Sequence, residues 1–239
     1  MLELKNISYE VTGDDSKEIL KDINLTIDER FVAITGPNGG GKSTLAKIIA
    51  GIIKPTSGRI FLDGEDITDL SITERAHKGI SFAFQQPVRF KGITVKDLIT
   101  YAVGHKISTA EACEYLSEVG LCAKDYINRE LNASLSGGEA KRIEIAMTMA
   151  RGTSLSIFDE PEAGIDLWSF QSLIKVFEMM HNKAGGSIII ISHQERILNI
   201  ADKIIVLANG KVINTGSKDD VLPGLLADGP GCSKLVNKL

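Results

Sequence analysis

A glycine-rich stretch over residues 36–44 holds the residues of this chain that could bind phosphate groups. Glycine lets successive backbone N–H groups turn toward one anion without a clash from a Cβ atom. Lys42 adds a positive charge, and the Ser43 hydroxyl is an oxygen ligand that Mg²⁺ accepts. The stretch therefore predicts a site for a nucleoside triphosphate, ATP, with its Mg²⁺ ion. Its members are Gly36, Pro37, Asn38, Gly39, Gly40, Gly41, Lys42, Ser43 and Thr44.

The sequence around this stretch supports the same prediction. A short apolar run, Phe31–Thr35, precedes it as a predicted strand, and Ser43–Ile53 follows as a predicted helix that Gly51 and Pro55 end. This is the context that a Walker A motif, Gly-x-x-x-x-Gly-Lys-Ser, requires. The positive end of the helix would add to the field on the phosphates. A glycine-rich turn without a ligand is the alternative, and the strand and helix on either side argue against it.

Two adjacent acids follow a second apolar run. Leu155–Phe158 is a predicted buried strand, and Asp159 and Glu160 come directly after it. Asp159 is placed to hold the Mg²⁺ sphere, and Glu160 to polarise a water molecule that attacks the phosphate. Acids at a strand end are more often solvated. The upstream phosphate loop favours a catalytic role instead.

Gln85 and His193 each follow a predicted strand, Ser81–Phe84 and Ile188–Ile191 respectively. The carboxyl ends of parallel strands form the edge at which open α/β sheets bind ligands. We therefore expect both side chains at the phosphate site, with His193 in contact with the γ-phosphate.

The remaining patterns predict an α/β fold with two kinds of sheet. Leu2–Tyr9 and Ile19–Ile27 alternate apolar and polar residues around a Gly-Asp-Asp turn, and we expect them to form a separate antiparallel layer. The later strands alternate with helices, which predicts a largely parallel, covered sheet. Further strands are expected at Arg59–Leu62, Ser187–Ile191, Lys203–Leu207 and Lys211–Asn214, and a helix at Trp168–Asn182.

Residues 85–151 differ in character from the rest of the chain. Val95–Val103, Thr109–Val119 and Glu139–Met149 have helical periodicity, and no strand is predicted between them. This predicts a helical subdomain over 85–151, inserted into a catalytic lobe formed by 1–84 and 152–239. The chain would then be a single domain of 239 residues.

Composition limits the possible partners. With 27 Lys and Arg against 31 Asp and Glu, the net charge of −4 predicts no broad nucleic-acid surface. No apolar run approaches the roughly 20 residues that span a bilayer, so no direct membrane insertion is expected. The charged start, Met-Leu-Glu-Leu-Lys, predicts no secretory signal. Cys113, Cys122 and Cys232 lack a Cys-x-x-Cys spacing, which favours free thiols in the cytoplasm over a metal site shared with a partner.

Four features occur along the chain in this order: Gln85, Leu135–Glu139, Asp159–Glu160 and His193. By these features, the chain resembles the ABC-type ATPases over nearly its whole length. The resemblance implies the P-loop NTPase fold of that family, with an antiparallel β layer and an inserted helical subdomain. It implies that Gln85 couples Mg²⁺ and the water to the helical subdomain, that Glu160 is the catalytic base and that His193 is the switch histidine.

The same resemblance implies a pocket shared between two copies of the chain. Leu135–Glu139 is similar to the family's signature motif, and Asp166 to its D-loop aspartate. By resemblance, Ser136 and Gly138 would touch the γ-phosphate bound to the other copy. The positive end of the helix that the signature opens would face that anion across the dimer seam.

Three stretches resemble the SufC-type ATPases of iron–sulfur cluster assembly: residues 79–94, 136–145 and 193–198. This implies a SufB-like scaffold protein as partner. The alternative is the nucleotide-binding subunit of an ABC membrane transporter. The two functions would differ in the protein bound around residues 85–98. An ATPase acting on ribosomes or DNA is a third class, but the second module or long coiled-coil insert usual in that class is missing from this sequence.

Several residues depart from the usual patterns or leave alternatives open. Val11 occupies the position where many ABC ATPases stack an aromatic ring on adenine, and Tyr9 on the same strand face is the alternative. Pro161 matches the transporter pattern. Lys141 and Arg142, one turn after the signature, either form a solvated basic face or make a salt bridge to a catalytic acid.

Overall fold

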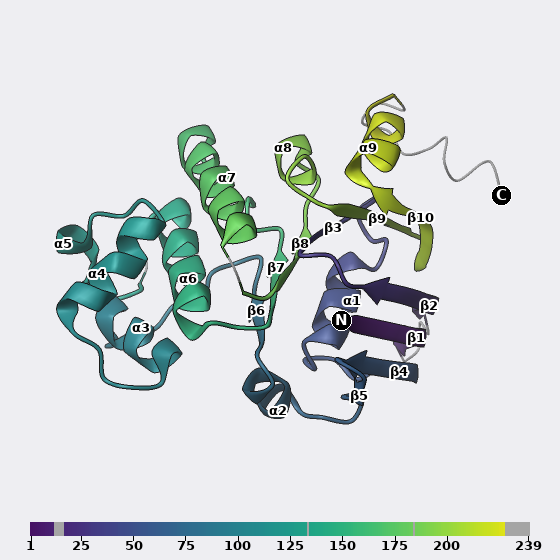
Figure 1. The fold of residues 1–239 in the computed structure, drawn as a ribbon, viewed down its shortest axis with the longest axis horizontal. Coiled ribbons are helices and arrows are strands. Elements are labelled where there is room, and N and C mark those ends of the chain that lie inside the picture. The colour runs from purple at the N-terminus through teal and green to yellow at the C-terminus, as the bar shows by residue number, and fades with distance from the viewer. Residues whose placement is uncertain (12–16, 133, 184, 228–239) are drawn as a thin grey trace.

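Two β-sheets and a set of helices form the protein (Figure 1). The computed structural model describes residues 1–11, 17–132, 134–183 and 185–227. The first sheet has the order β2-β1-β4-β5, and its neighbouring strands are antiparallel. The predicted antiparallel layer is therefore confirmed, and the Gly-Asp-Asp turn lies outside the described residues. The strands are β1 (Leu2–Val11), β2 (Lys17–Ile27), β4 (Ser57–Leu62) and β5 (Glu65–Asp66).

The second sheet carries the predicted site. Its order is β10-β9-β3-β8-β7-β6, and all neighbours are parallel except β9 and β10. The expectation of a largely parallel sheet is thus confirmed. Every residue of β3 and β7 is buried, which explains why these strands are continuous apolar runs. The strands are β3 (Phe31–Thr35), β6 (Ile80–Ala83), β7 (Leu155–Asp159), β8 (Ser187–Ile191), β9 (Lys203–Ala208) and β10 (Lys211–Ser217).

Helices fill the chain between β6 and β7. In Figure 1 these helices gather at the opposite end of the molecule from the antiparallel sheet. They are α3 (Val95–Val103), α4 (Thr109–Glu118), α5 (Ala123–Tyr126) and α6 (Gly137–Arg151). The described residues of this segment include no named strand, only an isolated bridge between Thr94 and Glu130. The division into a lobe and a subdomain at 85–151 stays a prediction.

The other helices flank the parallel sheet. They are α1 (Lys42–Ile49), α2 (Ile72–His77), α7 (Leu167–Asn182), α8 (Glu195–Leu198) and α9 (Lys218–Ala227). Sequence patterns missed α2, α5 and α8, which are too short to show a helical period. They also missed α9, because it contains Pro223, a residue that usually ends helices. Among the described residues, no helix has both the length and the apolar character that a bilayer crossing demands.

The parallel sheet separates two hydrophobic cores. Phe31 and Ala33 of β3 point into the core on the side of α7, whereas Val32 and Ile34 point into the core shared with α1 and the antiparallel sheet. This follows from the alternation of side chains along a strand. Phe177 of α7 packs edge to face on Phe31, with ring centroids 6.2 Å apart. Both faces of β3, the strand that leads into the phosphate loop, are therefore packed.

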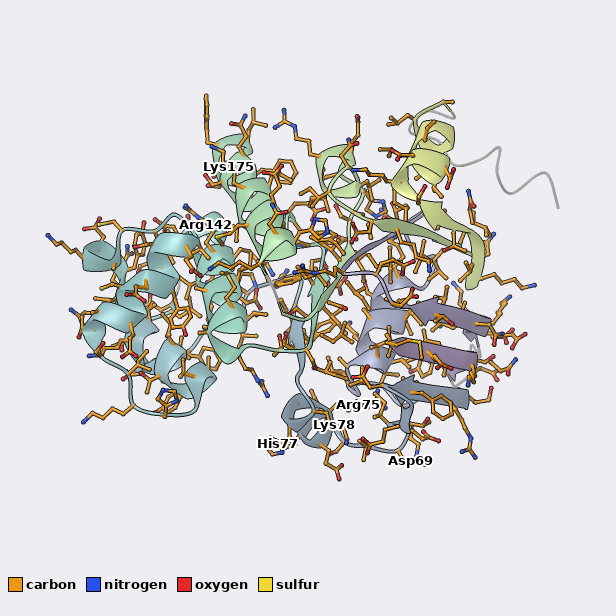
Figure 2. The ribbon with its side chains drawn as sticks, in the orientation of Figure 1. Asp69, Arg75, His77, Lys78, Arg142 and Lys175 are labelled. Carbon is orange, nitrogen blue, oxygen red and sulfur yellow. The ribbon has the colours of Figure 1, made fainter. Side chains whose placement is uncertain are left out.

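Arg75 of α2 (Figure 2) holds the far end of α1. Its guanidinium donates hydrogen bonds to the carbonyl oxygens of Ile48 (2.7 Å) and Ile49 (2.8 Å), which end α1. It also donates to the carbonyls of Thr68 (2.9 Å) and Leu70 (3.2 Å). Only 1% of Arg75 is exposed, and burial lowers its pKa against the opposing charges of Asp66 and Asp69. A single cation thus supplies donors to the carbonyls at the end of α1, where Ile48 also accepts from the N–H of Gly51 at 3.1 Å.

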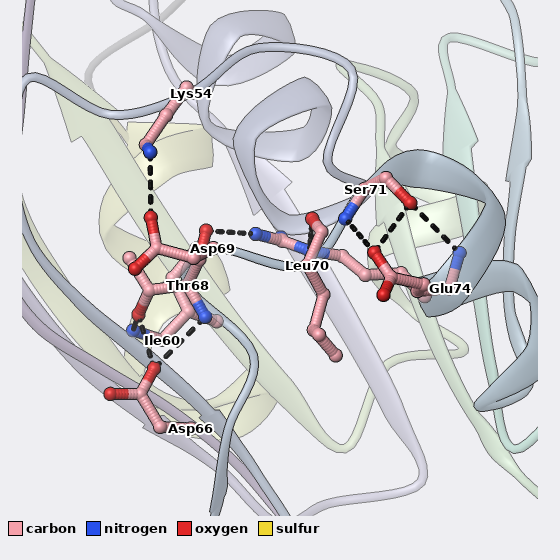
Figure 3. A network of polar contacts seen from close by, with 9 residues as sticks. Lys54, Ile60, Asp66, Thr68, Asp69, Leu70, Ser71 and Glu74 are labelled. Carbon is pink, nitrogen blue, oxygen red and sulfur yellow. Dashed lines mark hydrogen bonds and ion pairs between the residues drawn. The ribbon is translucent and has the colours of Figure 1, made fainter.

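Polar contacts hold the segment before α2 in place around this cation (Figure 3). The Asp66 carboxylate accepts from the N–H and the hydroxyl of Thr68, at 2.9 and 2.6 Å. Ser71 and Glu74 form a capping box at the start of α2, and hydrogen bonds from Ser71 lower the pKa of Glu74. The carbonyls of Thr68 and Leu70 that accept from Arg75 are therefore fixed by the local turn.

We expect Arg75→Ala to destabilise the protein by roughly 3–5 kcal/mol, because it leaves buried carbonyls without donors. Urea unfolding measures the loss as a lower midpoint at an unchanged slope. Arg59→Ala is the matched control: Arg59 forms an exposed ion pair with Asp66 at 3.0 Å, and its loss costs less than about 1 kcal/mol. Equal losses in the two variants would contradict the role of Arg75.

Candidate active site

The loop between β3 and α1 takes a conformation that requires glycine at two positions. Gly36 has φ 129°, and a Cβ atom there would lie 2.1 Å from the carbonyl oxygen of Leu207. Gly41, the N-cap of α1, has φ 100°, and a Cβ would lie 2.7 Å from the Leu20 side chain. No side chain of the described chain caps the first turn of α1. Its N–H groups and dipole are therefore available to an anion.

Lys42 lies across the mouth of this loop. Its Nζ donates to the carbonyl oxygens of Gly36 (2.9 Å) and Pro37 (3.0 Å), and the residue is only 5% exposed. The ammonium group is thus placed beside the backbone that would enclose a phosphate. This agrees with the predicted strand–loop–helix arrangement.

Ser43 and Asp159 come together, as predicted, although they are far apart in sequence. The Ser43 hydroxyl donates to Oδ1 of Asp159 at 2.9 Å, and Asp159 is 4% exposed. Burial raises the pKa of Asp159 and the Glu160 charge adds to this, while the Ser43 hydrogen bond opposes it. A buried carboxylate beside a hydroxyl fits a hard divalent cation such as Mg²⁺.

A hollow of about 340 Å³ adjoins this pair and is lined by Ser43, Gln85 and Asp159 together with Lys47, Phe84, Gln86 and Val88. In the part of the chain that the structure describes, no group of three or more His, Cys, Asp or Glu residues could hold a metal ion. The oxygens present suit an ion that is held partly by phosphate and water, as Mg²⁺ commonly is.

Glu160 lies where three neighbouring strands end. Gln85 follows β6 and donates from Nε2 to Oε2 of Glu160 at 2.7 Å. His193 follows β8, and its Nε2 lies 3.6 Å from Oε1 of Glu160. Glu160 also has φ 44°, in the left-handed region that non-glycine residues seldom occupy. Such strain gathers at functional sites, where the surrounding structure enforces it.

His193 is held toward its neutral form. Burial lowers its pKa, the nearby Lys42 charge lowers it further, and the Glu160 charge raises it. A neutral imidazole can donate one hydrogen bond and accept another. This is suitable for a contact with a phosphate oxygen.

The signature residues lie in a different part of the structure. Ser136 is the N-cap of α6, and it forms a capping box with Glu139. A Cβ at Gly138 would lie 2.8 Å from the Ser169 side chain of α7, which places the signature beside the first turn of that helix. Asp166 caps the same turn by accepting from Ser169 and Trp168 at 3.0 Å. Ser136, Gly138 and Asp166 therefore form a second group, and Figure 1 shows α6 on the far side of β6 from α1.

One contact beside the site was not foreseen from the sequence. One carboxylate oxygen of Glu162 accepts from the hydroxyl of Ser192, while the other is buried without a partner among the described residues. Burial raises the pKa of Glu162. The only sequence signal is the position of Ser192 immediately before His193. This contact joins the segment after Glu160 to the turn that carries His193.

The solvated basic face expected for Lys141 and Arg142 is wrong for Lys141. This lysine is 1% exposed, and its ion pair is with Glu144 at 2.9 Å, not with a catalytic acid. Arg142 donates to the carbonyls of Gly138 and Gly120. The two open alternatives for adenine differ in exposure: Tyr9 packs against a core, whereas Val11 is 42% exposed.

Comparisons with known proteins point to one family. The sequence profile of the ABC transporter family matches residues 20–163. The uncharacterized ABC transporter ATP-binding protein MJ0035 of Methanocaldococcus jannaschii is 42% identical over 86% of this chain and 86% of its own length. The probable ATP-dependent transporter ycf16 of Cyanophora paradoxa is 34% identical over 92% of this chain and 89% of its own.

A solved structure has the same fold. It is a dimer of the ATP-binding cassette MJ0796 in a post-hydrolysis state with ADP and Pi, 27% identical to this chain. The TM-score is 0.81, and the match covers 91% of this chain and 99% of that one. The expected α/β P-loop fold of ABC ATPases is confirmed.

The signature cap predicts a pH-dependent stability. A hydrogen bond from Tyr126 lowers the pKa of Glu139, and the Ser136 cap lowers it further. Glu139 therefore stabilises the fold fully above its ordinary pKa of 4.5, and this contribution is lost as pH falls through the lowered value. We expect Tyr126→Phe to cost about 1 kcal/mol at pH 7, and less below pH 4.5.

Denaturant unfolding of Tyr126→Phe and the parent chain across this pH range measures the difference. Tyr101→Phe is the control, because Tyr101 is 72% exposed and its loss should be neutral at every pH. A cost for Tyr126→Phe that did not change with pH would show that Glu139 is not the partner responsible.

Proposed function

The chain belongs to the ABC transporter family of ATP-binding proteins and is an ATP-hydrolysing enzyme; on this premise we propose that it is a cytoplasmic ATPase that drives iron–sulfur cluster assembly on a SufB-like scaffold. ABC ATPases bind ATP, typically with Mg²⁺, and dimerise on it. The observation that carries the catalytic part is the convergence of Gln85 and His193 on Glu160 at the ends of adjacent strands. The partner is inferred from the three stretches that resemble SufC-type ATPases.

The site residues divide the work by position. The backbone of 36–41 and Lys42 would hold the β- and γ-phosphates, with the dipole of α1 behind them. Ser43, Asp159 and Gln85 would hold Mg²⁺, which when bound neutralises charge on the phosphates. Thr44 continues the same turn of the helix.

Glu160 would accept the proton of the attacking water. Gln85 orients its carboxylate by donating at 2.7 Å, so the other oxygen faces His193. His193, held toward the neutral form, would donate to the γ-phosphate from Nε2 and so keep the reacting phosphorus near the water. Positioning and charge stabilisation account for most of the catalysis in phosphoryl transfer.

The signature group would complete the pocket of a second copy. Ser136 and Gly138 open α6, so the N–H groups and dipole at this end of the helix can face a γ-phosphate across the seam. Asp166 caps the helix beside them and would hold this edge in shape. The dimeric state of the MJ0796 cassette supports a similar arrangement here.

An apolar groove of about 520 Å³ is the proposed docking surface for the scaffold. Residues of α2, β6, α3 and α6 line it together with Phe84 and Val88 from the segment between β6 and α3, and the side chains of Phe84, Val88 and Tyr101 are exposed. It adjoins Gln85, so a bound partner would lie next to the catalytic site. We propose that an apolar segment of the SufB-like scaffold occupies it.

A transporter subunit is the second candidate, because the relatives reported above are named as ABC transporter or ATP-dependent transporter proteins. In that case a segment of a membrane subunit would occupy the same groove. The ATP site and the dimer would work in the same way in both cases. Only the partner separates the two functions.

The shared pocket predicts complementation between two inactive variants. Lys42→Ala lacks the phosphate cation, and Ser136→Ala lacks the signature hydroxyl, so each alone should hydrolyse little ATP. In a mixed dimer, one pocket combines the intact loop of the Ser136 variant with the intact signature of the Lys42 variant. We expect mixing to restore phosphate release above the sum of the two. If mixing the two variants does not increase phosphate release at concentrations where the parent chain dimerises, the shared pocket is contradicted.

The partner is tested by co-expression with a SufB-like scaffold. The scaffold should co-purify in stoichiometric amount, and Tyr101→Glu should abolish this while ATP binding persists, because it places a charge in the groove at a residue that does not line the hollow of Ser43 and Asp159. Lys175→Glu, at an exposed position of α7, is the control. Visible absorbance of the scaffold reports its cluster content. Co-purification of a polytopic membrane protein in place of the scaffold would support the transporter function.

A further inference from the structure

Two charged side chains of α6 hold the backbone of Phe84, the residue immediately before Gln85. Lys141 donates from Nζ to the carbonyl oxygen of Phe84 and forms an ion pair with Glu144 at 2.9 Å. Against the burial that raises it, the Phe84 backbone lowers the pKa of the Glu144 carboxylate. The carbonyl of Phe84 is therefore held by Lys141, and Glu144 holds Lys141 in place.

The need for these contacts follows from the sheet. β6 is the last strand in the order of the parallel sheet, so it has a strand neighbour on one side only. Phe84 follows the end of β6, and its N–H and carbonyl must find other partners when they are buried. Helix α6 supplies Lys141 as the partner of the carbonyl, in place of a further strand.

Burying the ion pair of Lys141 and Glu144 costs free energy, because both charges lose contact with water. A gain in stability therefore does not explain why the pair is buried. The side chain of Lys141 is 2% exposed and that of Glu144 is 16% exposed. Burial raises the pKa of Glu144 against the opposing charge and hydrogen bond of Lys141. Apolar residues of similar volume are often as stable as a buried ion pair. What they cannot do is hold the orientation of a peptide group.

Phe84 lies between the two hollows that the proposed function uses. It lines the apolar groove on one side and the hollow of Ser43 and Asp159 on the other. Gln85 follows it directly and reaches Glu160 at 2.7 Å. A rotation of the Phe84 backbone would displace Gln85, the next residue, from this hydrogen bond.

We propose that Lys141 and Glu144 are positioning residues that lock the backbone of Phe84, and through it set Gln85 against Glu160. Because α6 begins at the signature residue Ser136, the same pair ties the signature helix and the floor of the groove to Gln85. A partner that presses on Phe84 would act on catalysis through this lock. The inference rests on the proposed role of Gln85.

A double-mutant cycle tests the proposal on the full chain. We expect Lys141→Met to lower kcat by about 10–100-fold, since small displacements of positioning groups have effects of this size. The Kd for ATP should change by less than about twofold, because Lys141 makes no phosphate contact in the proposed site. In a Gln85→Ala background, the same change should lower kcat by no more than about twofold further. Lys141→Arg, which keeps a charged donor, should recover part of the rate.

Lys175→Met is the matched control, an exposed lysine of α7 labelled in Figure 2; it should leave kcat unchanged. If Lys141→Met does not fold, Lys141→Met/Glu144→Leu replaces it in the cycle, since this pair buries no unpaired charge. If the fold losses in kcat from Gln85→Ala and Lys141→Met multiply in full in the double variant, the two residues act independently. This result would overturn the lock and leave the role of Gln85 intact. Full activity of Gln85→Ala itself would overturn the proposed role of Gln85 and this inference together.

Discussion

The carboxylates of Asp159 and Glu160 lie at the end of β7. Placing negative charge there costs free energy, and this cost determines which groups must lie beside the two carboxylates. Asp159 is relieved in part by the Ser43 hydroxyl, and Glu160 by the Gln85 amide. Each partner comes from an element that the sheet brings to the same edge. The charge of Asp159 remains under-compensated by the chain alone, since burial raises the pKa of Asp159. A divalent cation would supply the missing positive charge.

Helix ends connect this edge to the remainder of the molecule. The N-terminus of α1 presents its N–H groups to the phosphate loop, while Arg75 satisfies the carbonyls at its other end. The signature helix α6 is capped at Ser136, and one turn later Lys141 reaches the backbone before Gln85. Such a helix moves as a rigid body, so a displacement at one end also displaces the other end. The site therefore depends on contacts well outside the phosphate loop.

The apolar groove and the hollow at Ser43 share Phe84 and Val88. A partner in the groove and a nucleotide in the hollow would thus act on the same short segment. This arrangement suits either a scaffold protein or a transporter subunit. Any partner that fills the groove would contact the same segment, whichever protein it belongs to. The chemistry of ATP is common to both functions, and the partner is a separate property of the groove surface.

The residues that act locally were predictable from the sequence, and those that act across elements were not. The loop at 36–44 and the ends of β6, β7 and β8 follow from patterns within one element, and parallel strands bring their ends to a common edge. The bounds of β3, α3 and β8 agree with the sequence prediction. Packing alone decided that Arg75 caps α1, that Glu162 meets Ser192 and that Lys141 is buried beside Glu144. A lysine one turn into a helix has the same local pattern whether it faces water or a neighbouring strand end, so only the tertiary structure determines its partner.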